Sequence, residues 1–461
     1  MVTQIIAGLK NFFIFNSTLG TKEGEELKKI LYYYPITENT DIQIKNVGLV
    51  EGIIQFTETF KPSSPVSSLH TNRTRHLYYQ PEKNYWMVMT LQINYATKEG
   101  SNDTEDLQDD IEDNVYESIL KQAYLMYRLF WNTFESVKDI GNLKKTLELF
   151  YRAYIQNMKL ANADILNILS GIQYLPLDKQ TFLKVQCFIN CLESNYGIIK
   201  YTSFLFNDHL IWSGVEPTDM QIVYQYLINN LLPANIETEL QGGSIPRNSP
   251  SPFAALRHGR FITGPSNLKL AKTIGKVPKV YLFASGEARG YHLVVYRVLS
   301  ATICLFIKGD IELTLDLFKV LDEFLNSKLI SIVSDIAEYC SKQVVTPSGC
   351  SDSSPRFIYF NKLNLAYKST VHLDNKQSGN IACPKESMKI AVEMKANAPS
   401  LGQSGETIVK TMNDYWVVMK VSNNREFYIA LQQKNASLID ISEEVRRICE
   451  TELKGIFFPQ M

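Results

Sequence analysis

A short pattern of bulky apolar residues closed by an asparagine occurs three times in this chain. It occupies residues 13–16, 204–207 and 358–361, as Phe-Ile-Phe-Asn, Phe-Leu-Phe-Asn and Ile-Tyr-Phe-Asn. Such a run, ended by a residue that tolerates a turn, is typical of a strand buried on both faces of a sheet. A second pattern, Tyr-Trp followed by three apolar residues, lies downstream of two of the copies, at 85–89 and 415–419. The repetition predicts three versions of one folding module.

Length and charge agree with this prediction and exclude some classes of protein. At about 150 residues per domain, a chain of 461 residues is expected to form about three domains. A formal net charge of -1 argues against binding nucleic acid mainly through its phosphates. Seven cysteines, an odd number, indicate reduced thiols, and the first ten residues lack a secretory signal. We therefore expect a cytosolic protein whose contact with membranes is at most peripheral, since no apolar stretch is long enough for a bilayer span.

Periodicity and turn residues predict a similar order of elements in each module. The first module is predicted to have strands at 11–16, 29–34, 68–79 and 85–93, and helices at 42–60, 111–134 and 143–159. After a helix at 179–192, the second is predicted to have strands at 201–206, 210–212, 279–283 and 291–307, and helices at 217–232 and 313–339. The third is predicted to have strands at 357–361, 366–372, 415–421 and 426–432, and helices at 387–396 and 442–453.

This order predicts an α+β fold, in which each module is an antiparallel sheet with helices packed on it. We place the modules at residues 8–165, 195–343 and 355–461. The Gly-, Pro- and Ser-rich stretches at 241–252 and 344–355 are expected to be a surface loop and a linker.

The helix predicted at 42–60, with Asp41 as its cap, carries two apolar stripes. One stripe is formed by Val47, Val50 and Ile54, and the other by Leu49, Ile53, Phe56 and Phe60. Gly48 and Gly52 lie beside the second stripe, where each costs about 1 kcal/mol of helix propensity relative to alanine but lets another backbone come close. The second stripe either meets a partner protein or packs under later helices of its own module, and the sequence leaves both interpretations open.

A small basic cluster lies in the strand predicted at 68–79, which a turn at Pro81 would join to the next strand. Within one strand, His70 and His76 share one side while Arg73 and Arg75 share the other. These residues are expected to form a basic edge that touches phosphates or an acidic protein surface. The alternative is a solvated edge strand whose charges prevent aggregation.

Motifs of covalent chemistry are absent from the sequence. It has no phosphate-binding loop, dinucleotide fingerprint, nucleophile elbow or zinc-protease motif. Cys187 and Cys191 lie one helical turn apart without a nearby histidine, so we expect buried thiols and no zinc. The acidic run at 103–113 lacks calcium-loop spacing and is expected to be a solvated loop leading into a helix. We predict no catalytic residue, no metal site and no cofactor.

Longer stretches of the chain resemble the Ccz-type vacuolar fusion proteins, in order and over nearly the whole length. In the first module these are Phe-Phe-Ile-Phe-Asn-Ser-Thr-Leu-Gly at 12–20, Glu-Gly-Glu-Glu at 23–26, Lys-Lys-Ile-Leu at 28–31, Asn-Val-Gly-Leu at 46–49, Ser-Leu-His-Thr at 68–71 and Asn-Tyr-Trp-Met-Val-Met at 84–89. Further along they are Leu-Ile-Trp-Ser-Gly at 210–214, Gly-Arg-Phe at 259–261, Thr-Gly-Pro at 263–265, Lys-Ser-Thr-Val-His at 368–372 and Asp-Tyr-Trp-Val-Val at 414–418.

The resemblance implies three longin domains and a role in a complex. It implies pairing with a homologous Mon-type subunit, and in animals with a third subunit. Together these chains are expected to act as a guanine-nucleotide exchange factor for the Rab GTPase of late endosomes and lysosomes (Rab seven), in endosome maturation, vacuole or lysosome fusion and autophagy. The protein would then be cytoplasmic and recruited to endosomal and lysosomal membranes. The alternative is a longin adaptor that scaffolds a trafficking complex without exchange activity; a hydrolase is the least favoured class.

No catalytic residue is carried over from the resemblance. Within this resemblance, we place the surface for the partner and the Rab on the first module, near Gly48, Leu49, Gly52, Ile53 and Phe56. There the wide apolar arc of the predicted helix could pair with the equivalent helix of a homologous subunit.

Overall fold

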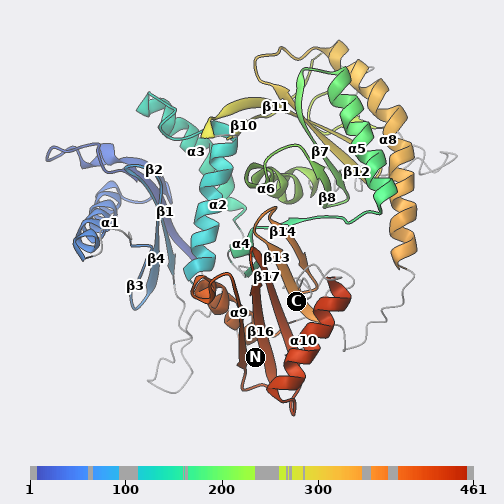
Figure 1. Ribbon diagram of the computed structural model, residues 1–461. Helices are drawn as coiled ribbons and strands as arrows, with labels where there is room; N and C mark the ends of the chain where they lie inside the picture. The colour runs from blue at the N-terminus through green and yellow to red at the C-terminus, as the bar shows by residue number, and fades with distance from the viewer. Residues whose placement is uncertain are drawn as a thin grey trace, which may run out of the picture. The chain divides into compact units, whose positions relative to one another are not determined.

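The computed structural model describes residues 8–60, 66–92, 113–158, 160, 165–233, 259–265, 268, 273–283, 286–344, 355–371 and 383–453. These residues form three sheets, each with helices packed on it (Figure 1). The α+β class expected from the sequence is confirmed.

The first sheet lies within residues 8–92. Its strands are β1 (Gly8–Asn16), β2 (Ile30–Tyr34), β3 (Ser68–His70), β4 (Thr74–Glu82) and β5 (Tyr85–Gln92). They pair antiparallel in the order β2-β1-β5-β4-β3. Helix α1 (Thr40–Phe60) covers one face, and α2 (Asp113–Trp131) and α3 (Ile140–Gln156) cover the other (Figure 1).

Helices on both faces explain why β1 is apolar at successive positions. Phe13 and Phe15 belong to the core beneath α1. Phe12 points the other way, and its ring centroid lies 5.2 Å from that of Tyr151 on α3. Alternate residues of a strand face opposite sides of the sheet, so a strand covered on both sides needs apolar residues throughout.

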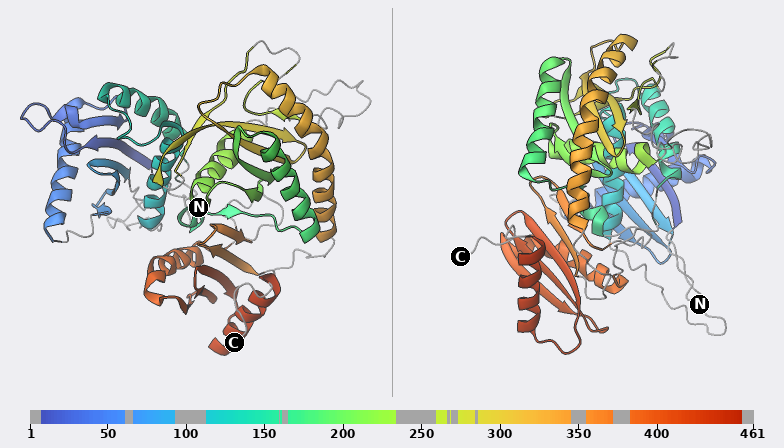
Figure 2. Two further views of the ribbon diagram at one scale, coloured as in Figure 1. Left: turned by 45° about the horizontal axis from the view of Figure 1, so that its top comes forward. Right: turned by 90° about the vertical axis from the view of Figure 1, so that its right-hand side faces the viewer.

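The second sheet is built from β7 (Ile199–Phe206), β8 (His209–Ser213), β9 (Arg260–Phe261), β10 (Lys279–Leu282), β11 (Arg289–Val298) and β12 (Ala301–Lys308). Its order is β10-β11-β12-β7-β8, with β9 paired to β11. Helices α5 (Lys179–Asn195) and α8 (Leu315–Val344) lie side by side on one face and share its core (Figure 2). Helix α6 (Pro217–Tyr226), which continues as a π-helical turn at Leu227–Leu231, lies on the other face (Figure 1).

The third sheet has the order β15-β16-β17-β13-β14-β6. Its strands are β6 (Ile172–Gln173), β13 (Arg356–Asn361), β14 (Ala366–Ser369), β15 (Ser404–Lys410), β16 (Tyr415–Ser422) and β17 (Arg425–Gln432). Strand β6, which follows the short helix α4 (Ile165–Leu169), pairs with β14 in parallel. Helix α9 (Lys385–Asn397) leads through a 3-10 turn (Ala398–Leu401) into β15, and α10 (Leu438–Glu452) follows β17.

Contacts between residues divide the chain into two compact units that differ from the three modules. One unit comprises residues 1–169, 371–422 and 428–461, and the other comprises 170–370 and 423–427. Strand β6 precedes the second module in sequence but belongs to the third sheet. The number of sheets matches the number of sequence repeats. The boundaries of the two compact units do not coincide with those of the three modules.

Several predicted elements are wrong in detail because the turns lie at positions other than those expected. Residues 68–79 form two strands, since a turn at 71–73 separates β3 from β4. Pro81 lies inside β4, and the turn to β5 is instead made at Asn84, with φ +66°. The stretch 291–307 is also two strands, β11 and β12, joined by a turn with Leu299 at φ +51°. Leucine is uncommon at positive φ, so nothing in the sequence marked that turn.

Other predictions differ at single elements or lie outside the described residues. Asn39 caps α1 in place of Asp41, because its Oδ1 accepts a hydrogen bond from the Asp41 backbone N–H at 2.9 Å. Strand β15 was not predicted. The loop at 241–252, nearly all of the linker at 344–355 and the acidic run at 103–113 lie outside the described residues, apart from Val344, Pro355 and Asp113.

Candidate protein-binding surface

Helix α1 has an inner face that fixes it to the first sheet. Val47, Val50 and Ile54 are at most 5% exposed and share a core with β1, β4 and β5. These are the three residues predicted for one stripe. Burying aliphatic side chains of this size stabilises the folded state by about 1.5–3 kcal/mol each.

Two polar contacts set the rotation of α1 on the sheet. The Asn46 side-chain amide donates to the Tyr33 hydroxyl at 2.7 Å. On the helix flank, Lys29 Nζ lies 2.6 Å from Glu51 Oε2, with the two side chains only 16% and 17% exposed. An ion pair that is largely shielded from water is screened less than a surface pair, so it resists rotation of the helix. No sequence pattern pointed to these contacts, because each joins the helix to a different element.

The outer face of α1 is apolar, and the described part of the chain leaves most of it exposed. Leu49 is 58% exposed, Phe56 64% and Phe60 74%, while Ile53 is partly buried. The Phe56 and Phe60 rings pack edge to face, with centroids 4.9 Å apart. Because α2 and α3 lie on the opposite face of the sheet (Figure 1), they leave this stripe open. The interpretation in which later helices of the module cover the second stripe is therefore wrong. We call Gly48, Leu49, Gly52, Ile53, Phe56 and Phe60 the outer face of α1.

The two glycines of the outer face have no role inside the described chain. A Cβ built on Gly48 or on Gly52 would have no heavy atom within 4 Å. Neither residue has the positive φ that requires glycine. Each glycine therefore weakens the helix by about 1 kcal/mol relative to alanine without any packing gain in this chain. What they do provide is a flat strip on which another backbone can approach closely.

The predicted basic edge of His70, Arg73, Arg75 and His76 does not form. Arg75 is 5% exposed; its Nη1 lies 3.4 Å from Asp113 Oδ1 and its guanidinium stacks over the Tyr116 ring at 5.5 Å. His70 Nε2 lies 2.8 Å from the same carboxylate oxygen. Arg75 and His70 thus anchor the start of α2 to the sheet.

The other two members of the predicted basic edge lie apart. His76 sits between hydroxyls, with Nε2 2.8 Å from Thr74 Oγ1 and Nδ1 3.1 Å from Thr90 Oγ1. Burial, with a smaller effect from Lys10, lowers the pKa of His76. Arg73 is exposed, in the turn at 71–73. That turn breaks the alternation on which the prediction relied.

The described residues offer no site for metal chemistry. They contain no group of three or more His, Cys, Asp or Glu side chains that could hold a metal ion. Cys187 is exposed and Cys191 is partly buried, so the expectation of two buried thiols is wrong. Among the helices in the described ranges, none is both long and apolar enough to cross a bilayer.

Family models match all three modules. The model described as the first longin domain of INTU, CCZ1 and HPS4 matches residues 9–132. Those described as Intu longin-like domains 2 and 3 match residues 199–326 and 351–448.

Three relatives that match nearly the whole chain carry the same name. A "Vacuolar fusion protein CCZ1 homolog" of Nematostella vectensis is 42% identical over 461 residues, which cover 98% of each chain. One of Xenopus laevis is 41% identical over 457 residues, 98% of this chain and 97% of the relative. One of Dictyostelium discoideum is 29% identical over 463 residues, 99% of each chain. On the identity to these relatives and the match of three longin-like domains, this chain belongs to the family of CCZ1 vacuolar fusion protein homologues.

Proposed function

We propose that this chain is one subunit of a heteromeric guanine-nucleotide exchange factor. With a Mon-type homologous partner, and in animals a third subunit, it promotes GDP release from the Rab GTPase of late endosomes and lysosomes (Rab seven). It acts as a peripheral protein on endosomal and lysosomal membranes, in endosome maturation, vacuole or lysosome fusion and autophagy. The observation that carries this proposal is the outer face of α1, an uncovered apolar stripe beside two glycines in a longin domain.

Exchange needs no reactive group. An exchange factor binds the nucleotide-free GTPase more tightly than the loaded form, and this difference in affinity shifts the population. A nucleotide held at nanomolar strength represents about 12 kcal/mol of binding free energy. Much of that energy comes from Mg²⁺ and the phosphate-loop lysine, so a protein surface that moves the switch loops off the metal lowers the barrier to release.

The outer face of α1 suits pairing with a homologous helix. Burying an exposed Leu or Phe side chain contributes about 1.5–3 kcal/mol, so Leu49, Phe56 and Phe60 together supply several kcal/mol. Specific interfaces bury about 800 Å² per partner, which is more than one helix face offers. We therefore assign α1 the centre of the contact, with the rest supplied by neighbouring surfaces.

The test is release of fluorescent GDP from the Rab GTPase. It is measured with this chain alone, with the Mon-type partner alone, and with both together. Acceleration only by the pair supports the proposal. Binding of the Rab without acceleration in any mixture would identify a longin adaptor instead.

A further inference from the structure

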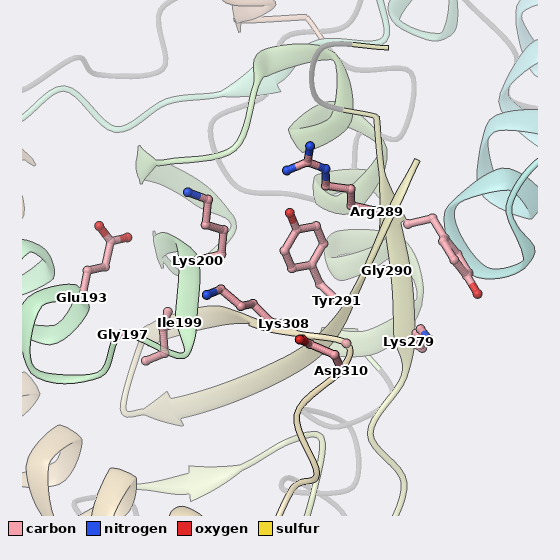
Figure 3. A pocket seen from close by; sticks show the side chains of 12 residues that line it. Glu193, Gly197, Ile199, Lys200, Lys279, Arg289, Gly290, Tyr291, Lys308 and Asp310 are labelled. Atoms are coloured by element: carbon pink, nitrogen blue, oxygen red, sulfur yellow. The ribbon is translucent and has the colours of Figure 1, made fainter. Parts of the chain in front are cut away.

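The second module contains an open hollow at one end of its sheet that the exchange function does not use. Its volume is about 870 Å³, and its lining comes from β7, β10, β11, β12, the loops beside them and the end of α5 (Figure 3). No single stretch of sequence signals it, because the strands that meet there are far apart along the chain. All of its lining residues belong to the same compact unit.

The hollow is rich in positive charge. Four cations line it, Lys200, Lys279, Arg289 and Lys308, against two carboxylates, Glu193 and Asp310. Arg289 is paired, with Nη2 3.1 Å from Glu287 Oε2 at the rim. Among the described residues, no carboxylate lies within 4.0 Å of the ammonium group of any of the three lysines. Like charges around one concavity repel each other, and a bound anion would relieve that repulsion.

The cations on one face of the sheet converge on an aromatic wall. Lys308 and Tyr291 are directly opposed across β12 and β11, so their side chains share a face. Tyr291 is 5% exposed, and its ring centroid lies 5.7 Å from that of Tyr201, over which the Lys200 ammonium also lies at 5.7 Å. Figure 3 shows Lys200, Lys308 and Tyr291 around the same space, with the Arg289 guanidinium beyond the ring. Lys279 is opposite His292, the residue that follows Tyr291, so the Lys279 side chain lies on the other face of the sheet from Tyr291.

Two glycines, Gly290 and Gly309, contribute backbone to the lining of the hollow. The Gly309 N–H donates to the Gly290 carbonyl at 3.0 Å, and a Cβ on Gly309 would lie 2.6 Å from that carbonyl oxygen. Any larger residue at this position would collide with backbone. The lining therefore combines an aromatic ring, glycine backbone and ammonium groups.

We propose that this hollow binds a phosphorylated polyol, with the phosphate held by Lys200 and Lys308 and the polyol ring against Tyr291. A phosphate monoester carries nearly two negative charges and three acceptor oxygens, so one group can take both ammonium donors. A single carboxylate could also accept from both lysines, but it carries only one negative charge against two ammonium groups. Such a ligand occurs both as a free inositol phosphate and as the headgroup of a phosphorylated lipid.

The test is isothermal titration of the full chain with inositol trisphosphate and with inorganic phosphate. The site variant is Lys200→Gln with Lys308→Gln, and the control is Lys319→Gln with Lys342→Gln on α8, which removes the same charge from exposed lysines of the same module. We expect one site per chain for inositol trisphosphate, an affinity loss of about 10-fold or more in the site variant, and little change in the control.

Co-sedimentation with phosphatidylcholine vesicles, with and without phosphatidylinositol monophosphate, distinguishes the two sources. Binding to both inositol trisphosphate and the phosphorylated vesicles assigns the site to a lipid headgroup, and binding to inositol trisphosphate alone assigns it to a free metabolite. Equal loss in both variants, no saturable binding to any phosphorylated probe, or tighter binding of a glutamate-rich peptide would overturn the proposal. Nucleotide exchange in the absence of vesicles should be the same in the site variant and wild type, so this test is separate from that of the exchange function.

Discussion

At the scale of single residues, Glu82 connects three parts of the first module. Its carboxylate accepts hydrogen bonds from the Tyr124 hydroxyl at 2.7 Å and from the backbone N–H groups of Phe134 and Glu135 at 2.6 and 2.9 Å. Burial, together with the carboxylate, raises the pKa of Tyr124, so the phenol remains a donor. One side chain thus ties the end of β4 to α2 and to the loop that follows it.

Replacing this carboxylate with an amide tests that role. In Glu82→Gln, a neutral amide oxygen and an NH₂ group replace the two acceptor oxygens, so one of the donors loses its partner. We expect the free energy of unfolding to fall by about 1–3 kcal/mol, measured by urea denaturation. Glu58→Gln, on the exposed side of α1, is the control and should change stability by less than about 0.5 kcal/mol. Equal effects would show that the network contributes nothing.

His76 predicts a dependence of stability on pH. Burial lowers the pKa of His76 below the ordinary value of 6.5, so the folded chain binds a proton at this residue more weakly than the unfolded chain does. The stabilisation is present above that value and is lost as the pH falls through the lowered pKa of the folded state. Urea denaturation of wild type and His76→Gln between about pH 7 and about pH 5 should show the advantage of wild type shrinking as acid is added. A constant difference would mean that the pKa of His76 is not lowered.

At the scale of elements, the two faces of α1 should respond oppositely to the same substitution. Val50 is 3% exposed, so Val50→Asp buries an unpaired carboxylate and should abolish the cooperative melt. Phe56→Asp places the charge in solvent, so it should leave the melting temperature nearly unchanged while abolishing co-purification with the Mon-type partner. If Phe56→Asp destabilises the chain as strongly as Val50→Asp does, the outer face is part of the core. If it leaves association intact, α1 is not the binding surface.

The glycines of α1 give a test in which stability and association should change in opposite directions. A methyl group at Gly48 or Gly52 meets no atom of the described chain. Each single Gly→Ala variant should therefore stabilise the chain by up to about 1 kcal/mol, as read from chemical denaturation. The same methyl group would hold a partner helix away, so association measured by titration should weaken. Stabilisation without loss of affinity would show that no backbone approaches here.

At the scale of the whole molecule, the outer face of α1 and the hollow of the second module belong to different compact units. Residues that share no contact partners are expected to contribute independently. Phe56→Asp should therefore remove exchange activity and keep inositol trisphosphate binding. The variant with Lys200→Gln and Lys308→Gln should keep exchange activity and lose inositol trisphosphate binding. A chain that carries all three substitutions should lose both exchange activity and inositol trisphosphate binding, each by the same factor as in the separate variants. A loss that differs from the separate values would contradict the independence of the two sites.

The local pattern of the sequence predicted most strands and helices, the three sheets and the inner stripe of α1. Longer stretches of sequence carried the family resemblance. Apolar runs and helical periodicity are properties of neighbouring residues, so they can be read without knowing the fold. The outer face of α1 was recognisable as a stripe, but the sequence could not decide whether the stripe was covered. That depends on where α2 and α3 pack, and they pack on the opposite face of the sheet.

Tertiary structure alone decided which charged residues act together. The buried Arg75 and the half-exposed His70 both contact Asp113, because a turn at 71–73 reverses the chain between β3 and β4, and no spacing marked that turn. Lys200 and Lys308 were separated along the chain by most of the second module and met only when β7 paired with β12 and β12 with β11. The spacing of apolar residues is a local property, so it can be recognised in the sequence. The interaction between two charged side chains depends on their distance in space, and that distance is fixed only once the sheets have formed.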